Sequence, residues 1–156
     1  MNIQNNSEYQ DDPGGNKSVI LDNISDIDIE DDLFESLFGI VMQRENQPVD
    51  AFVNLLLVRD GFIKQYNQQY LGRDEVTDVI SFSTEVPGIH FLGDIIIDTK
   101  VAEIQRENRT IGEELQILFL HGLLHLLGYD HLAAKQEKVM QSKEKEYMKY
   151  IKEYNT

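Results

Sequence analysis

The sequence predicts an α+β fold, in which a small mixed β-sheet of about four strands packs against helices. Three observations support this prediction. Short runs rich in Val, Ile and Phe alternate with segments whose apolar residues recur at helical spacing. The strand-like runs at 79–82 and 91–97 are joined through a Pro-Gly pair, as in paired strands. The tract at 117–127 is apolar on nearly every side, which predicts a buried central helix.

Composition limits the class of protein. At 156 residues the chain suits one domain with its own hydrophobic core. The chain has no Cys, which excludes disulfides and thiolate zinc ligands. The first residues lack a basic segment followed by an apolar one, and the longest apolar tract is too short to cross a bilayer. We therefore expect a cytoplasmic protein with no membrane segment.

The net charge of −14 argues against a general nucleic-acid binder, because contacts with phosphates need local positive charge. The acidic residues are unevenly distributed, however. Residues 22–35 contain seven of them and no basic residue, which accounts for half of the imbalance. Basic residues are scattered through the middle of the chain: Arg59, Lys64, Arg73, Lys100, Arg106 and Arg109. A locally basic path for RNA is therefore compatible with an acidic protein.

The N-terminal part is expected to form a tail, a strand and a helix. Residues 1–17 are polar, which predicts a disordered tail and leaves residues 18–156 as a single domain. Residues 18–21 fit a short first strand. From Leu33 onward, apolar residues recur at i, i+1, i+4, i+5 and i+8, which predicts an amphipathic helix with Asp28 as its N-cap.

The middle of the chain is expected to supply the other strands. Residues 49–58 are dense in Val, Leu and Phe and have the length of a buried strand. After Asp60-Gly61, apolar residues at helical spacing continue to Tyr70 and predict a second helix. The paired strands at 79–82 and 91–97 complete the predicted sheet.

Three more helices are expected after the last strand. Asp98 or Thr99 can cap a short helix. Thr110, with Glu113 three residues later, forms a capping box that opens the helix containing the long apolar tract. The last segment, 132–154, mixes Lys and Glu around scattered apolar residues, which predicts a helix that lies over the domain with a solvated charged face.

The strongest chemical signal lies in the apolar helix. Three of the four histidines fall within eleven residues: His121, His125 and His131. His121 and His125 are four apart, so they lie on one face of a helix, one turn from each other, and can bind one ion. Gly128 is typical of the residue just past a helix C-terminus, where the chain reverses. Such a turn would bring His131 back as a third ligand.

Three protein ligands and one position open to water are typical of catalytic zinc, whereas structural zinc sites are closed and usually rich in Cys. We therefore expect one Zn²⁺ per chain, although imidazole also binds other transition metals. Zinc peptidases with the related H-E-x-x-H spacing carry a Glu after the first His as general base. Gly122 occupies that position here. A glycine inside a helix indicates either close approach of a backbone or substrate, or tight helix packing.

Three other residues are weaker site candidates. Asp130 precedes His131 and can orient that imidazole, accept a proton or cap the turn. His90 follows Pro87-Gly88 and is expected in an exposed loop, where contact with substrate is the alternative. Asp94 interrupts an apolar strand pattern, so it either lines a cleft or pairs with backbone or an Arg.

The segment 121–131, H-G-L-L-H-L-L-G-Y-D-H, resembles the signature of the YbeY-type endoribonucleases, bacterial factors for ribosomal RNA maturation. Residues 77–83, T-D-V-I-S-F-S, resemble the family's T-[DN]-V-L-S-F-P segment, and residues 93–95 resemble its G-D-I strand. With Asn67 and Tyr70 in the preceding helix, the resemblance extends from about residue 50 to the end of the histidine motif.

This resemblance implies a metal-dependent hydrolase that is a single-strand-specific endoribonuclease. It would act in ribosomal RNA maturation and ribosome biogenesis, use a metal-activated water for phosphodiester hydrolysis, and have RNA and ribosomal components as partners. Two alternatives stay open. One is a metallopeptidase or amidase on the same three-histidine site, and the other is a non-catalytic ribosome-associated metalloprotein.

The sequence departs from the family pattern at two positions. The family has an Arg after the Tyr that precedes its T-[DN]-V segment, and that Arg is counted among its functional residues. Here Leu71 follows Tyr70, and Arg73, two positions later, is the candidate substitute. Ser83 replaces the Pro that ends the family's S-F-P. Arg73 and Asp130 are therefore the catalytic candidates beside the three metal ligands.

Overall fold

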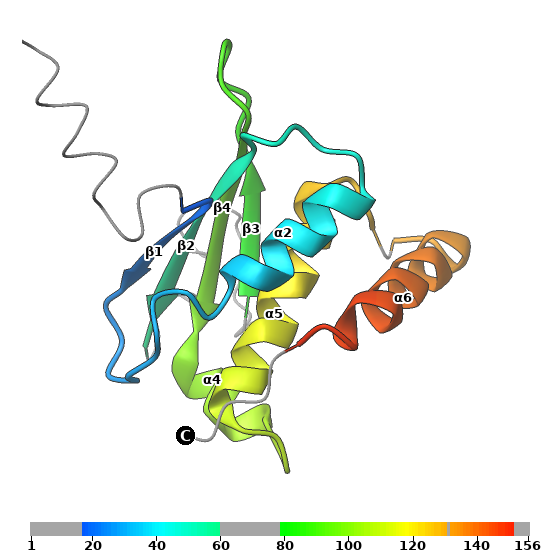
Figure 1. Cartoon of the computed structure of the whole chain (residues 1–156). Helices are drawn as coiled ribbons and strands as arrows, with labels where there is room; N and C mark the ends of the chain where they lie inside the picture. The colour runs from blue at the N-terminus through cyan, green and yellow to red at the C-terminus, as the bar shows by residue number, and fades with distance from the viewer. Residues whose placement is uncertain (1–16, 60–78, 131, 152–156) are drawn as a thin grey trace, which may run out of the picture.

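The computed structural model describes residues 17–59, 79–130 and 132–151. Its centre is a four-stranded sheet in the order β1-β2-β4-β3 (Figure 1). The strands are β1 (Val19–Asn23), β2 (Phe52–Val58), β3 (Val79–Ser83) and β4 (Phe91–Asp98). β1, β2 and β4 are parallel, whereas β3 runs antiparallel to β4. The sheet is therefore mixed, and the predicted α+β class is confirmed.

The described helices are α2 (Glu35–Arg44), α4 (Thr99–Gln105), α5 (Ile111–Leu126) and α6 (Ala134–Met148). Figure 1 shows α2 and α5 side by side over one face of the sheet, with α6 on the outer side of α5. α5 contacts strands β3 and β4 and the helices α2, α4 and α6. The expected central position of the histidine helix is thus confirmed.

The main core lies between the sheet and these helices. β2 alternates in burial because successive strand residues point to opposite faces, so Val53, Leu55 and Leu57 enter this core. Phe34, just before α2, meets Phe119 of α5 with the ring centroids 5.1 Å apart. Full burial of each such side chain contributes roughly 1.5–3 kcal/mol. The opposite face of the sheet carries a smaller apolar cluster: Val58, Ile80 and Ile96.

Local sequence signals explain where α4 and α5 begin. The Asp98 carboxylate accepts hydrogen bonds from the backbone N–H groups of Lys100 and Val101, as expected for an N-cap. The Thr110 hydroxyl accepts from the Glu113 backbone N–H at 3.1 Å, and the Glu113 carboxylate accepts from the Thr110 N–H at 2.9 Å. The predicted capping box is therefore present.

The predicted N-cap of α2 is wrong. Asp28 lies in the connection after β1, and the helix begins at Glu35 after Phe34, whose side chain makes no cap hydrogen bond. The Glu35 carboxylate instead accepts the backbone N–H groups of Ser18 and Val19, at 2.9 and 2.6 Å. The first turn of α2 is thus tied to the start of β1, which fixes its beginning several residues beyond Asp28.

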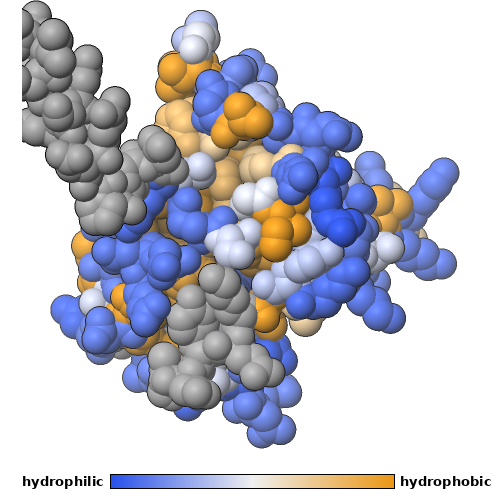
Figure 2. All heavy atoms as spheres, viewed as in Figure 1, coloured by the Kyte–Doolittle hydropathy of each residue, from blue (hydrophilic) through white to orange (hydrophobic). Residues whose placement is uncertain are grey.

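The remaining element predictions hold in part. The strand expected at 49–58 begins at Phe52, and the final helix expected within 132–154 is α6. Residues 1–16 of the tail expected at 1–17, and the helix expected to end at Tyr70, lie outside the described residues. Within the described ranges no helix has both the length and the apolar character of a bilayer span. Polar residues cover most of the face in Figure 2, with apolar patches near the β3–β4 hairpin at the top.

Candidate metal centre

Helix α5 presents two predicted ligands near its C-terminal end. The rings of His121 and His125 are edge to face, with centroids 4.8 Å apart and planes at 72°. The side chain of His121 is 33% exposed, so it is partly accessible rather than enclosed in the core. The helix ends at Leu126, and Gly128 has φ of 101°, as predicted for the turn after the helix. The sequence therefore placed both imidazoles correctly on one side of α5.

Gly122, between the two histidines, is explained by packing. A Cβ at this position would lie 3.0 Å from Cγ2 of Ile95 and 3.3 Å from Cγ2 of Val79. These distances are shorter than ordinary van der Waals contacts, so the missing side chain lets α5 lie directly on β3 and β4. Of the two explanations for this glycine, the structure favours tight packing, here against the sheet.

Sequence reasoning missed one residue that contacts this pair. Nδ1 of His121 lies 3.0 Å from Oε2 of Glu144, which comes from α6. A carboxylate oxygen accepts, so Nδ1 of His121 donates in this contact, and Nε2 is the ring nitrogen that can bind an ion in the tautomer with a single N–H. The available signal was the i, i+4, i+7 series Met140, Glu144, Tyr147, in which a carboxylate stands on an otherwise apolar stripe.

A second carboxylate, Glu45, holds α6 and the turn after α5 against α2. Its oxygens accept hydrogen bonds from the hydroxyls of Tyr129 at 2.7 Å and Tyr147 at 2.5 Å, and from Lys143 Nζ at 3.2 Å. The Glu45 side chain is 11% exposed. Burial raises its pKa, but the hydrogen bonds from the two tyrosines and Lys143 outweigh this, so its pKa is lower than usual. Burial and the bond to Glu45 raise the pKa of Tyr147.

Glu45→Gln should therefore destabilise the fold. The amide nitrogen of Gln donates and cannot accept, so one tyrosine hydroxyl or Lys143 loses its acceptor, and we expect a loss of about 2 kcal/mol in the free energy of unfolding at pH 7. Because folding lowers the pKa of Glu45, its contribution is present above the unfolded value near 4.5 and disappears as pH falls through the folded value. Urea unfolding of the original protein and of Glu45→Gln, at pH 7 and at pH 3, measures this loss of stability and its pH dependence.

Glu103→Gln is the matched control, because it removes the same charge from an exposed position on α4. This control should stay within about 0.5 kcal/mol of the original protein. An equal loss for Glu45→Gln at both pH values would show that the carboxylate's charge does not stabilise this junction.

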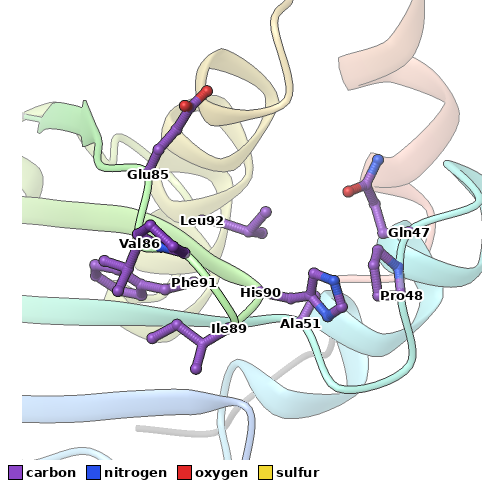
Figure 3. Close-up of a pocket in the computed structure, with 10 residues that line it drawn as sticks. Gln47, Pro48, Ala51, Glu85, Val86, Ile89, His90, Phe91 and Leu92 are labelled. Atoms are coloured by element: carbon purple, nitrogen blue, oxygen red, sulfur yellow. The ribbon is translucent and has the colours of Figure 1, made fainter.

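The weaker candidates have other partners. Asp94 Oδ1 accepts a hydrogen bond from the Asn54 side chain at 3.1 Å, which is a side-chain pairing across β2 and β4. His90 is 55% exposed, and its Nδ1 lies 2.6 Å from Oδ1 of Asp50. His90 also lines a pocket of about 440 Å³ between the α2–β2 connection and the β3–β4 hairpin (Figure 3). His121 and His125 do not line this pocket.

The third predicted ligand lies outside the described residues, as does Arg73. Among the residues that the structure describes, which exclude His131, no three side chains of the His, Cys, Asp and Glu types gather closely enough to hold an ion. The three-histidine site therefore stays a prediction. Asp130 is described and half-buried, directly after Tyr129, whose hydroxyl is fixed by Glu45.

Comparisons with known proteins place this architecture in a family. A family model described as Endoribonuclease YbeY matches residues 20–152. Endoribonuclease YbeY of Desulforamulus reducens is 35% identical, covering 81% of this chain and 92% of the relative. Endoribonuclease YbeY of Bacillus subtilis is 38% identical over 73% and 81% of the two chains, and that of Staphylococcus aureus is 42% identical over 68% and 76%.

The fold comparison agrees. The solution structure of TM1509 from Thermotoga maritima superimposes with a TM-score of 0.59 at 29% identity, covering 85% of this chain and 88% of the other. The family model covers every described strand except the first residue of β1, and the whole of α5 with its two histidines. This chain therefore belongs to the YbeY family, the family described as Endoribonuclease YbeY.

Proposed function

We propose that this protein is a metal-dependent endoribonuclease that cuts single-stranded RNA during ribosomal RNA maturation. Membership of the endoribonuclease family supports the reaction class. The observation that carries the metal dependence is the pair His121 and His125, whose rings lie side by side at the end of a helix that is otherwise packed into the core. Two histidines four residues apart on one helix face are the usual arrangement of two ligands that bind the same metal ion.

The donor set suits zinc. His121, His125 and His131 would hold one Zn²⁺ per chain, and another transition metal is an alternative because imidazole binds several. When bound, such an ion lowers the pKa of its water to near 7 and polarises a phosphoryl oxygen. The chain itself orients the two described ligands: α5 holds His121 and His125 one turn apart, and the hydrogen bond from Tyr129 to Glu45 holds the turn after the helix.

Two more residues are assigned roles in this proposal. Arg73 would pair with a phosphate of the RNA, in place of the arginine that the family has two positions earlier. Asp130 would orient the imidazole that follows it in the sequence or accept a proton. The net charge of −14 makes such a local cation important, because the chain as a whole repels a polyanion. We place the protein in the cytoplasm, where ribosomal RNA and ribosomal components are its partners.

The decisive experiment compares substrates. The purified protein should cut a single-stranded RNA oligonucleotide and leave the matching duplex and a casein peptide intact. A chelator should stop the cleavage and added Zn²⁺ should restore it. We expect no peptide cleavage because Gly122 has no side chain where zinc peptidases place their general base.

Each competing function gives a different result in the same experiment. Peptide hydrolysis without RNA cleavage would assign the site to a peptidase or amidase. Stoichiometric zinc with neither cleavage would make the protein a non-catalytic ribosome-associated metalloprotein. RNA cleavage that persists in the chelator would refute the metal-dependent mechanism.

A further inference from the structure

Helices α5 and α6 meet through a polar contact at the candidate metal centre. Nδ1 of His121 and Oε2 of Glu144 are 3.0 Å apart, although the two residues are 23 positions apart in the sequence. Both side chains are only partly exposed, at 33% and 25%. The contact therefore lies in a partly desolvated place, where a charge-assisted hydrogen bond is stronger than at the surface.

The position of Glu144 on α6 is unusual for a glutamate. Met140 and Tyr147 are the two buried residues of this helix, and Glu144 stands between them at i+4 and i−3, on the same face. An apolar residue in this position would avoid the cost of desolvating a carboxylate. The carboxylate therefore needs a partner on α5, and His121 is that partner.

Neighbouring contacts hold Glu144 in place. Lys143 and Tyr147, one residue before it and three after it, both bind Glu45 of the α2 C-terminus. Glu146 lies 3.6 Å from Arg44, which adds a second link between α6 and α2. These contacts fix the rotation of α6 about its axis, so that Glu144 faces His121 without depending on the histidine contact alone.

We propose that Glu144 is a positioning residue for the metal site, an inference that rests on the metal dependence proposed above. Its carboxylate accepts the Nδ1–H of His121, which keeps the lone pair on Nε2 and fixes the orientation of the ring for metal binding. Carboxylates that contact metal-bound histidines in this way commonly have these effects. In this role Glu144 acts through His121, the side chain that it contacts.

The test is the zinc affinity of the purified full-length chain, measured by competition with a chromophoric chelator at a fixed neutral pH. Glu144→Ala should weaken zinc binding about ten- to a hundredfold. Glu144→Gln keeps an oxygen that accepts the Nδ1–H but loses the charge, so its affinity should lie between those of Glu144→Ala and the original protein. Glu137→Ala and Glu137→Gln are the matched controls, since they remove the same charge from an exposed position on α6.

A purely structural role predicts a different pattern. If Glu144 only joined α6 to α5, its substitution would lower the thermal stability of the metal-free protein and leave the zinc affinity of the folded protein unchanged. Unchanged affinity in Glu144→Ala, or an equal loss in the Glu137 variants, would overturn the proposal. Absence of zinc binding by the original protein would instead refute the metal site itself. Failure of the positioning role and failure of the metal site therefore give different results. The near-isosteric Glu144→Gln keeps the test valid if the alanine variant does not fold.

Discussion

His125→Ala should abolish RNA cleavage while the protein remains folded. A site with three histidine ligands has none to spare. Loss of a residue that only hydrogen-bonds to a metal ligand typically costs about 10- to 100-fold in metal affinity or activity. Loss of a direct ligand should therefore lower the cleavage rate by more than about 100-fold. His125 is only half-buried and lies at the last turn of α5, so truncation leaves the core intact. The cleavage rate of single-stranded RNA, measured with metal content on the same sample, tests this expectation.

His90→Ala is the matched control for this experiment. It makes the same substitution at a histidine that is 55% exposed and pairs with Asp50. This control should keep its metal and at least half of the cleavage rate. If His125→Ala retained one metal ion per chain and cleaved RNA at the original rate, the assignment of this helix as the metal centre would be wrong.

Gly93→Ala should be the most destabilising small substitution in the sheet. Gly93 has φ of 140°, and a Cβ there would lie 2.0 Å from the carbonyl oxygen of Phe82 and 3.1 Å from Cδ2 of Leu126. Gly93 pairs with Ser83 in the β3–β4 ladder, so the clash can be relieved only by separating these strands. We expect a loss of about 4 kcal/mol or more in the free energy of unfolding, measured with urea.

Gly39→Ala makes the same change within α2, where a Cβ would meet nothing within 4 Å. Alanine has the higher helix propensity, so this control should be unchanged or more stable by up to about 1 kcal/mol. A loss below about 1 kcal/mol for Gly93→Ala would mean that the hairpin can move away from Phe82. Because Leu126 belongs to the last turn of α5, such movement would also disturb the histidine helix.

The sequence could predict those elements whose signals are local. The capping box of Thr110 and Glu113 was predicted correctly, and of the two cap candidates Asp98 and Thr99 the structure has Asp98; both caps lie within three residues of the groups they bind. The spacing of His121 and His125 is likewise set by helix geometry alone. The pattern of the strands was readable for the same reason, since burial alternates along β2 with the period of a strand.

Features that depend on distant partners were misplaced or missed, because their local signals are weak. The start of α2 was misplaced because Glu35 binds backbone groups 16 and 17 residues away. Glu144 and Glu45 were overlooked because their partners lie 23 to 102 positions away along the chain. Gly122 left two explanations open because the side chain that packs against it, Ile95, comes from strand β4. In each case the missing information was tertiary packing, which a single sequence does not encode locally.

The zinc content of His131→Ala is the most direct test of the three-histidine site. Native mass spectrometry should find one zinc ion on the original chain and none on His131→Ala at the same zinc concentration, while circular dichroism shows the same helix content in both. This result would show that zinc binding requires His131 as well as the two histidines on α5. Equal zinc content in the two proteins would contradict the three-histidine site and the metal-dependent mechanism built on it.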